Sequence, residues 1–205
     1  MVCPSGCPYS SIQQALLDSA DQRTPVVSVC PGTYTETISV NFRQVILTGA
    51  GPEQTTINAH FEGSAITVFG GALLMRGFTI TGGRAVFGGG VHDLGSLTLQ
   101  NCVITGNTAG AAAGGGGGIN NGDHAFLGVV ATQVTENSAS NGNGGGILND
   151  GGIVQLRDAS QVTKSHAADG GGIFNQSNGI VSLSPGVIVS GNEPDNCVGT
   201  AACGA

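Results

Sequence analysis

The sequence contains no tryptophan and only two tyrosines, and charged residues make up 9% of its 205 residues. Six Lys and Arg stand against thirteen Asp and Glu, for a net charge of −7, and the cations are scattered along the chain. Nucleic-acid-binding domains carry clustered basic residues, so this composition excludes nucleic acid as a partner. No apolar run approaches the ~18 residues of a membrane-spanning helix, so we expect no membrane span.

Glycine, in contrast, is abundant, at 37 of 205 residues. The glycines are clustered and prolines number only seven, which excludes the regular Gly-X-Y pattern of collagen. Hydrophobic residues form 40% of the chain, enough to bury a core, which argues against intrinsic disorder. This composition favours many short strands joined by tight turns.

The six cysteines are Cys3, Cys7, Cys30, Cys102, Cys197 and Cys203. None of their spacings forms the paired CxxC of a structural zinc site, so we expect no metal site. Cysteines at both chain ends indicate disulfides that tie down the termini, which favours an oxidising compartment. We predict disulfides between Cys197 and Cys203 and between Cys7 and Cys30, with Cys102 as a buried thiol. If Cys102 is free, one of the three N-terminal cysteines must also be unpaired.

The first residues have neither the basic segment nor the apolar core of a signal peptide. Either no leader exists, or one that preceded this chain was removed. The cysteine pattern by itself predicts a secreted or cell-surface protein.

A glycine triplet followed by Val or Ile recurs four times, with its apolar residue at Val91, Ile119, Ile147 and Ile173. The intervals are 28, 28 and 26 residues. Two residues after each apolar residue stands Asp or Asn, at Asp93, Asn121, Asn149 and Asn175. A second series closes each unit with a Thr or Ser two residues before Asn or Ser, and its asparagines are Asn107, Asn137 and Asn192.

Repeats of this length with strand-like runs and no helical period predict the coils of a β-solenoid. Successive coils stack at ~4.8 Å, so a side-chain amide at one turn can bond to the coils above and below it. We therefore interpret both series as structural ladders that begin with Asp93 in one and Asn107 in the other. The triplets would supply positive φ angles or close backbone approach, which argues against a phosphate-binding loop.

We predict one domain over residues 1–205, a rod of six or seven coils. An N-terminal cap covers 1–25, with an amphipathic helix near 10–20 that begins with a Ser-x-x-Gln capping box. Irregular coils follow over 26–87, repeat coils over 88–192, and a C-terminal cap over 193–205. Expected strands in the repeat coils are 96–99, 129–132, 153–156 and 180–183.

The segment from Ser11 to Leu16, the Gly32-Thr33-Tyr34-Thr35-Glu36 element and residues 45–51 resemble the opening of many pectin-lyase-like proteins. The later triplet repeats are similar to those of polymorphic outer-membrane and related bacterial surface proteins. The resemblance implies an all-β, single-stranded right-handed parallel β-helix with a short N-terminal capping α-helix. It specifies function poorly, because this scaffold carries lyases, hydrolases, esterases and adhesins.

Most catalytic motifs of this superfamily are missing. Pectin methylesterases share the Gly-x-Tyr-x-Glu element at Gly32 to Glu36, but their paired aspartates and Arg-Pro-Trp segment are absent here. The Asn-Thr-Asp, Asp-Asp and Gly-His-Gly motifs of polygalacturonase-like hydrolases are also absent. The chain shows no acidic cluster for the Ca²⁺ of pectate lyases, and its cations share no evident coil position.

Asp and His residues that follow the triplets are the candidate catalytic groups. They are Asp93, Asp123, Asp150, His92 and His124. Stacked coils could bring two carboxylates to the ~5 Å separation used by retaining glycosidases. The alternative is that these residues cap turns through local hydrogen bonds, as Asx turns do.

A second candidate group lies in one coil and comprises Arg157, Lys164 and His166, which are candidate binding residues. Arg157 or Lys164 could act as the base of a lyase if burial or a neighbouring charge lowered its pKa. Solvated surface charge is the alternative interpretation. We favour a noncatalytic structural, adhesive or ligand-binding module with a polysaccharide or surface partner, and end-to-end or lateral self-association is possible. The alternative is a polysaccharide lyase or glycoside hydrolase. We expect no cofactor, and Ca²⁺ only for a lyase.

Overall fold

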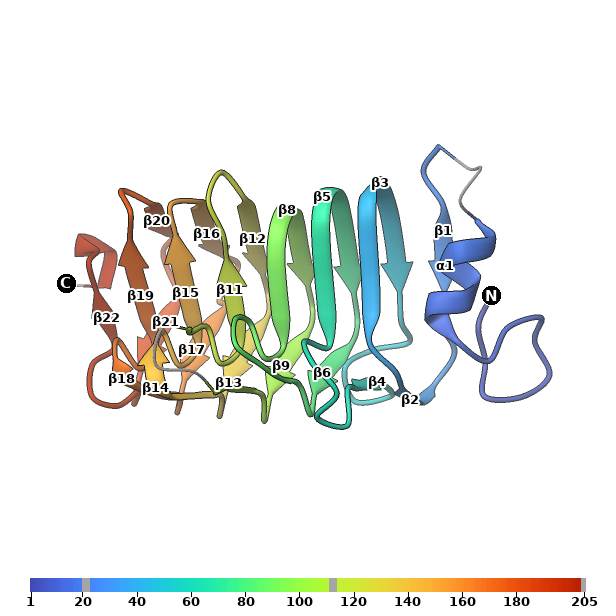
Figure 1. The fold of residues 1–205 in the computed structure, drawn as a ribbon, viewed down its shortest axis with the longest axis horizontal. Coiled ribbons are helices and arrows are strands. Elements are labelled where there is room, and N and C mark those ends of the chain that lie inside the picture. Colours follow the sequence, from blue (N-terminus) through green and yellow to red (C-terminus); the bar gives the residue numbers. More distant parts are fainter. Residues whose placement is uncertain (20–22, 111–113, 204–205) are drawn as a thin grey trace.

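The computed structural model describes residues 1–19, 23–110 and 114–203. The chain winds into about six coils stacked along one axis, and all its described strand pairs are parallel (Figure 1). The predicted right-handed parallel β-helix with a short N-terminal helix is confirmed. The last residue of the predicted helix, Ala20, and residues 204–205 of the predicted C-terminal cap lie outside the described residues.

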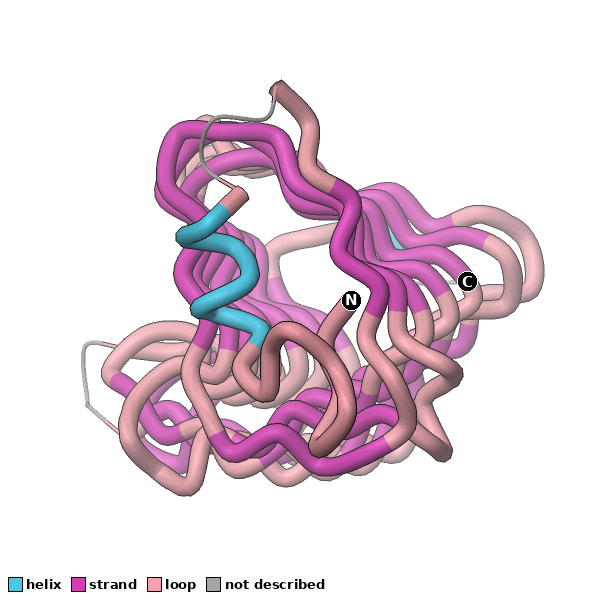
Figure 2. Tube along the Cα trace, turned by 90° about the vertical axis from the view of Figure 1, so that its right-hand side faces the viewer, coloured by secondary structure: helices cyan, strands magenta, loops and turns pink. Residues whose placement is uncertain are grey.

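Three sheets form the sides of the coil (Figure 2). The largest contains β1 (Val26–Ser28), β3 (Ile38–Thr48), β5 (Ile66–Arg76), β8 (Val91–Gln100), β11 (Ile119–Asn121), β12 (Phe126–Val130), β15 (Ile147–Asp150), β16 (Ile153–Arg157), β19 (Ile173–Gln176), β20 (Ile180–Leu183) and β22 (Cys197–Val198). The second contains β2 (Gly32–Thr35), β4 (Thr55–Asn58), β6 (Thr79–Thr81), β9 (Val103–Thr105), β13 (Gln133–Thr135), β17 (Gln161–Thr163) and β21 (Ile188–Ser190). The smallest contains β7 (Arg84–Ala85), β10 (Thr108–Ala109), β14 (Ser138–Asn143) and β18 (His166–Asp169).

In the first coils the largest sheet is built from long bent strands, whereas later coils divide the same path into two strands. The second half of β8 pairs with β12, which begins and ends earlier than the strand predicted at 129–132. It ends at Val130 because Ala131 has a φ of 46°. Thr132 then turns inward, and its hydroxyl donates to the carbonyl oxygen of Val130 at 2.8 Å.

Inward-facing residues stack in rows that run the length of the rod. One row, in strand register, contains Ile38, Ile66, Val91, Ile119, Ile147 and Ile173, all fully buried. The apolar residue after each glycine triplet belongs to this row. Each coil therefore buries the same side of the same strand, because the side chains of a strand alternate between its two faces.

The triplets occupy positions that only glycine fits well. Their first glycines have positive φ, 58° at Gly88 and 68° at Gly116. The third glycines leave no room for a side chain, because a Cβ on Gly90 would lie 2.6 Å from the Gly118 carbonyl oxygen. Both predicted roles of the triplets are present.

Both asparagine ladders form. In the first, Asn121 Nδ2 donates to Asn149 Oδ1, and Asn149 Nδ2 donates to Asn175 Oδ1, each at 2.7 Å. In the second, Asn107 Nδ2 donates to Asn137 Oδ1 at 3.0 Å. That ladder reaches Asn192 through Ser165, whose Oγ accepts from the Asn137 N–H and whose N–H donates to Asn192 Oδ1.

At the N-terminal end, α1 (Ile12–Asp18) lies across the open first coil and buries Ile12, Ala15 and Leu16 (Figure 2). The expected capping box is half formed, because Ser11 Oγ accepts from the Gln14 N–H while the Gln14 side chain bonds to Asp18. None of the described helices is long and apolar enough to cross a bilayer.

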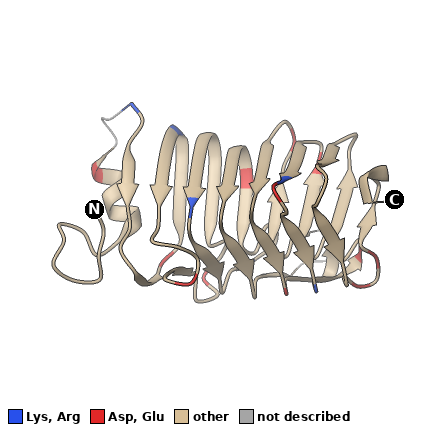
Figure 3. Ribbon diagram, turned by 180° about the vertical axis from the view of Figure 1, so that it is seen from behind, with Lys and Arg blue, Asp and Glu red and all other residues tan. Residues whose placement is uncertain are grey.

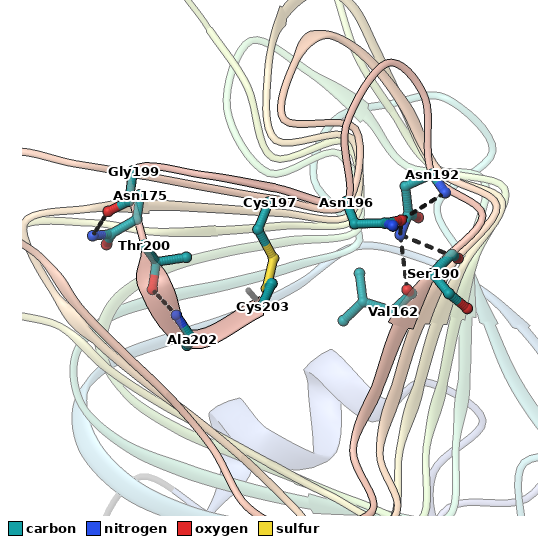
Figure 4. The surroundings of a disulfide bond; sticks show 10 residues. All are labelled: Val162, Asn175, Ser190, Asn192, Asn196, Cys197, Gly199, Thr200, Ala202 and Cys203. Atoms are coloured by element: carbon teal, nitrogen blue, oxygen red, sulfur yellow. Dashed lines mark hydrogen bonds between the residues drawn. A yellow bond between two sulfur atoms is a disulfide. The ribbon is translucent and has the colours of Figure 1, made fainter. Parts of the chain in front are cut away.

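At the C-terminal end, the chain closes over the last coil through β22 and a 3₁₀ helix, η1 (Ala201–Cys203). Cys197 and Cys203 form the predicted disulfide (Figure 4). The same segment ends both ladders, because the Gly199 carbonyl accepts from Asn175 Nδ2 and Asn196 Oδ1 accepts from Asn192 Nδ2.

Candidate functional site

The predicted catalytic residues after the triplets separate into interior and surface groups. Asp93 points into the coil and is 0% exposed, because it occupies an inward position of β8 in register with Asn121. His92 points to the opposite side and is half-buried, and its ring lies 6.1 Å from that of Phe87. Burial lowers the pKa of His92. Asp93 therefore lies apart from any surface that a ligand could reach.

Asp123 and His124 lie together on an exposed turn, with Asp123 Oδ2 3.4 Å from His124 Nε2. Asp150, one coil further on, accepts a hydrogen bond at 2.6 Å from the Ser177 hydroxyl. We expected Asp93 to lie near Asp123 or Asp150 as a pair of carboxylates. The structure instead separates Asp93, which is inside the coil, from the other two. Strand alternation places Asp93 at an inward position of β8. Asp123 and Asp150 instead come after the inward-facing Asn121 and Asn149.

The outer face formed by the second halves of the long strands carries a groove of about 550 Å³. Its lining combines two arginines, polar side chains and an apolar floor: Thr24, Gln44, Val45, Ile46, Ala72, Leu73, Leu74, Arg76, Ser96, Thr98, Gln100, Val130, Arg157 and Asp158. Asp158 is the single acidic residue of this lining. Charged side chains are few on this face of a protein whose net charge is negative (Figure 3).

Arg76 and Arg157 stand in the same outward row of this face. The row runs from Arg76 through Gln100 and Val130 to Arg157, one residue per coil. Three coil steps separate the two backbone positions, or ~14 Å along the axis at ~4.8 Å per step. Arg76 Nε donates to Gln100 Oε1 at 2.8 Å, which orients the Arg76 guanidinium.

This row corrects the expectation that the cations share no coil position. The successive separations along the row are 24, 30 and 27 residues, so no constant period links Arg76 to Arg157 in the sequence. Only the strand pairing shows that the two positions are equivalent. Aligning the outward positions of the predicted strands coil by coil could have found Arg76.

The predicted one-coil group of Arg157, Lys164 and His166 is divided between two sides of the rod. Arg157 ends β16 and faces the groove, whereas Lys164 and His166 line a separate pocket of about 320 Å³ with Glu193. The Lys164 ammonium lies 3.7 Å from Glu136 Oε1, and both side chains are largely exposed. The coil turns between β16 and β18, so closeness in sequence does not place these cations on one face.

The N-terminal cysteines differ from the predicted Cys7–Cys30 pair. Cys3 is placed in bonding contact with both Cys7 and Cys30. One sulfur forms one disulfide at a time, so Cys3–Cys7 and Cys3–Cys30 are competing pairings and the third sulfur is a thiol. Among the described residues these three sulfurs are also the one group of metal-ligand type that lies within 4.8 Å. Cys102 is buried and free, as predicted.

Solved structures with a similar fold include "Pectin methylesterase from Carrot", at 14% identity and a TM-score of 0.43, with 98% of this chain and 86% of that chain covered. The deglycosylated pectin methylesterase from Aspergillus niger matches at 13% identity and a TM-score of 0.48, with 98% and 90% covered. No family model matches the chain, and no curated protein matches its sequence. The β-helix assignment rests on the parallel strand register itself, and the resemblance of the repeats to polymorphic outer-membrane proteins stays a prediction.

Proposed function

We propose that this protein is a secreted or cell-surface β-helix module that binds an extended acidic carbohydrate in the groove between Arg76 and Arg157. The observation that carries the proposal is the placement of these two arginines in one outward row, three coil steps apart. A guanidinium presents a planar fork of donors that matches a carboxylate. Two such groups along one row favour a ligand with repeated carboxylates over a single small anion.

The surface between the arginines suits a polysaccharide chain in other respects. Gln100, Ser96 and Thr98 offer hydrogen bonds to hydroxyl groups, while Leu74 and Ile46 offer an apolar floor. The groove follows the stacking direction of the coils, so a linear polymer can contact several coils at once. Contacts repeated along a polymer add to its affinity through multivalency.

The composition of the groove supports binding more than turnover. Glycoside hydrolysis ordinarily uses two carboxylates that flank the scissile bond. The described lining contains one, Asp158, and the predicted Asp93 is buried elsewhere. The catalytic alternative keeps Asp123, Asp150 and His124 as its candidates, none of which lines the groove. A secreted or surface location is supported by the Cys197–Cys203 disulfide.

Affinity electrophoresis in gels that contain polygalacturonate or alginate, with dextran as the neutral reference, tests the proposal. We expect the acidic polymers to retard the wild-type protein and the neutral polymer to leave its mobility unchanged. The double variant Arg76→Gln, Arg157→Gln should bind at least about tenfold more weakly, a loss of about 1.4 kcal/mol. Arg84→Gln is the matched control, because Arg84 lies on β7, in another sheet.

Binding by the double variant that equals that of the wild type would overturn the assignment of the groove. Release of new reducing ends or of unsaturated products from the same polymers would overturn the noncatalytic proposal. Loss of that release in Asp123→Asn or Asp150→Asn, but not in the arginine variants, would place catalysis on the turns after the triplets.

A further inference from the structure

Two buried side-chain oxygens among the described residues have no hydrogen-bond partner, and they belong to adjacent coils. They are Asp93 Oδ2 and Asn121 Oδ1. Asp93 and Asn121 are register partners in β8 and β11, and both side chains are 0% exposed. An ionised carboxylate and an amide oxygen are both acceptors, so neither can satisfy the other unless a proton lies between them.

The direction of the ladder settles which atom of Asn121 meets Asp93. The nitrogen of Asn121 donates toward Asn149, and that of Asn149 donates toward Asn175 and to the Gly152 carbonyl at 2.9 Å. At the far end, Asn175 Nδ2 donates to two backbone carbonyls, which only accept. Reversing the amides would give Asp93 a donor from Asn121, but it would turn the oxygens of Asn149 and Asn175 toward the backbone carbonyls that now accept from their nitrogens. Three carbonyl acceptors would then face oxygen, so Asn121 Oδ1 faces the coil of Asp93.

The second ladder shows how such an end is normally satisfied. Its first residue, Asn107, accepts a hydrogen bond at Oδ1 from the backbone N–H of Gly83 at 2.9 Å. The first ladder has no equivalent backbone donor among the described residues. In the coil before Asp93, the same inward row holds Val68, which has no side-chain donor to offer.

We propose that Asp93 carries a proton in the folded protein and that its Oδ2–H donates to Asn121 Oδ1, so that a neutral carboxylic acid forms the first member of the asparagine ladder. Asp93 Oδ1 accepts from the Gly95 N–H at 2.9 Å, which leaves Oδ2 as the protonated oxygen. Every polar atom at this end of the ladder then has a partner. The proton thus joins the first two triplet coils.

The surroundings of Asp93 favour the neutral form. Burial raises its pKa to about 7, against the opposing effect of the Gly95 and Leu97 N–H groups. The groups that face it across the coil steps, Val68 of β5 and Asn121 of β11, carry no charge. The nearest titratable residues of its own and the next coil, His92, Asp123 and His124, are directed outward. A hydrogen bond donated by the neutral acid raises the pKa further.

The proposal makes the stability of the fold depend on pH with a defined sign. An unfolded Asp titrates near pH 3.9, so between about pH 4 and 7 the folded state binds one proton more than the unfolded state. Stability from Asp93 is therefore fully present below about pH 4, falls as the pH rises toward 7, and levels off above the folded pKa. This is opposite to the behaviour of a carboxylate held in an ion pair.

Thermal unfolding of the full chain between pH 5 and 8 tests the proposal. We expect the Tm of the wild type to fall by about 5 to 10 °C over this range. Asp93→Asn supplies a permanent N–H donor, so its Tm should stay level and exceed that of the wild type at pH 8. Asp93→Val should also lose the pH dependence but melt below Asp93→Asn, because it leaves Asn121 Oδ1 unpartnered. Asp123→Asn, an exposed control, should retain the wild-type slope.

A direct measurement on the wild type keeps the proposal falsifiable if the variants fold poorly. The ¹³Cγ resonance of Asp93 should titrate with a midpoint near 7 or above. A midpoint near 4 for Asp93 would overturn the proposal. So would an Asp93→Asn protein that is less stable than the wild type at pH 8 or that keeps its pH slope.

Discussion

Ser11 donates its hydroxyl to Glu36 Oε2 at 2.8 Å, which ties the start of the capping helix to the first complete coil. The Glu36 carboxylate also accepts from the N–H groups of Ile12 and Gln13, at 2.8 and 2.9 Å. One acidic side chain thus satisfies three donors at the N-terminus of α1. Glu36 stands in the Gly-x-Tyr-x-Glu element that suggested a resemblance to pectin methylesterases, but here its contacts are those of a helix cap.

Replacing Glu36 by Ala should weaken the N-terminal cap. Three donors lose their acceptor, and two of them are backbone N–H groups that no helical carbonyl can satisfy. We expect the free energy of unfolding to fall by about 1–2 kcal/mol. Urea denaturation measures the loss, and Glu62→Ala is the control. An unchanged midpoint in Glu36→Ala would show that water replaces the carboxylate without cost.

Asn149→Ala should cost more, because Asn149 is the middle member of the first ladder. Its loss leaves Asn121 Nδ2 without its ladder acceptor and Asn175 Oδ1 without its donor, both within the stacked coils. We expect destabilisation by about 2–4 kcal/mol. Asn41→Ala, at an exposed strand position, should change stability by less than about 0.5 kcal/mol. Similar effects of the two substitutions would contradict a structural role for the ladder.

Gly118→Ala tests whether the triplets are required by close packing. A Cβ at this position would lie 2.7 Å from the Gly146 carbonyl oxygen and 3.0 Å from Asn137 Nδ2. We expect a loss of about 1–3 kcal/mol through overpacking. Gly110→Ala is the matched control, because among the described residues its Cβ would meet only the Ala85 carbonyl oxygen, at 4.0 Å. Thermal melts of both proteins should therefore separate clearly.

Thiol labelling should divide the cysteines into two kinetic classes. Burial raises the pKa of the Cys102 thiol to about 11, so little reactive thiolate forms at pH 8. We therefore expect Cys102 to be labelled only when the protein unfolds. One N-terminal thiol should react in the native protein, and peptide mapping should find Cys3 joined to Cys7 or Cys30. A Cys7–Cys30 peptide would contradict this arrangement. Cys102→Ser should remove only the slow class.

Local periodicity was enough to predict a β-solenoid and its ladders, and the resemblance to pectin-lyase-like proteins added the parallel β-helix. Each coil repeats the same inward positions. The intervals of 28, 28 and 26 residues between Ile119, Asn121 and their equivalents therefore predict which residues stack in one inward row and how the strands pair. The Cys197–Cys203 pair was also predictable, because its two cysteines are only six residues apart. The catalytic and binding groupings were less predictable, since nearness in sequence says little about which side of a coil a residue occupies.

The coil is therefore readable from the amino-acid order alone: its length, its buried face and its glycine and asparagine positions all depend on alternation within single strands. The tertiary structure alone decided which outward residues share a row, which sulfurs meet, and where the ladder ends. Arg76 and Arg157 become neighbours in one groove only after coils of unequal length are stacked. Asp93 and Asn121 likewise present two unpartnered oxygens to each other only because the ladder has a direction, which its carbonyl acceptors impose from the opposite end.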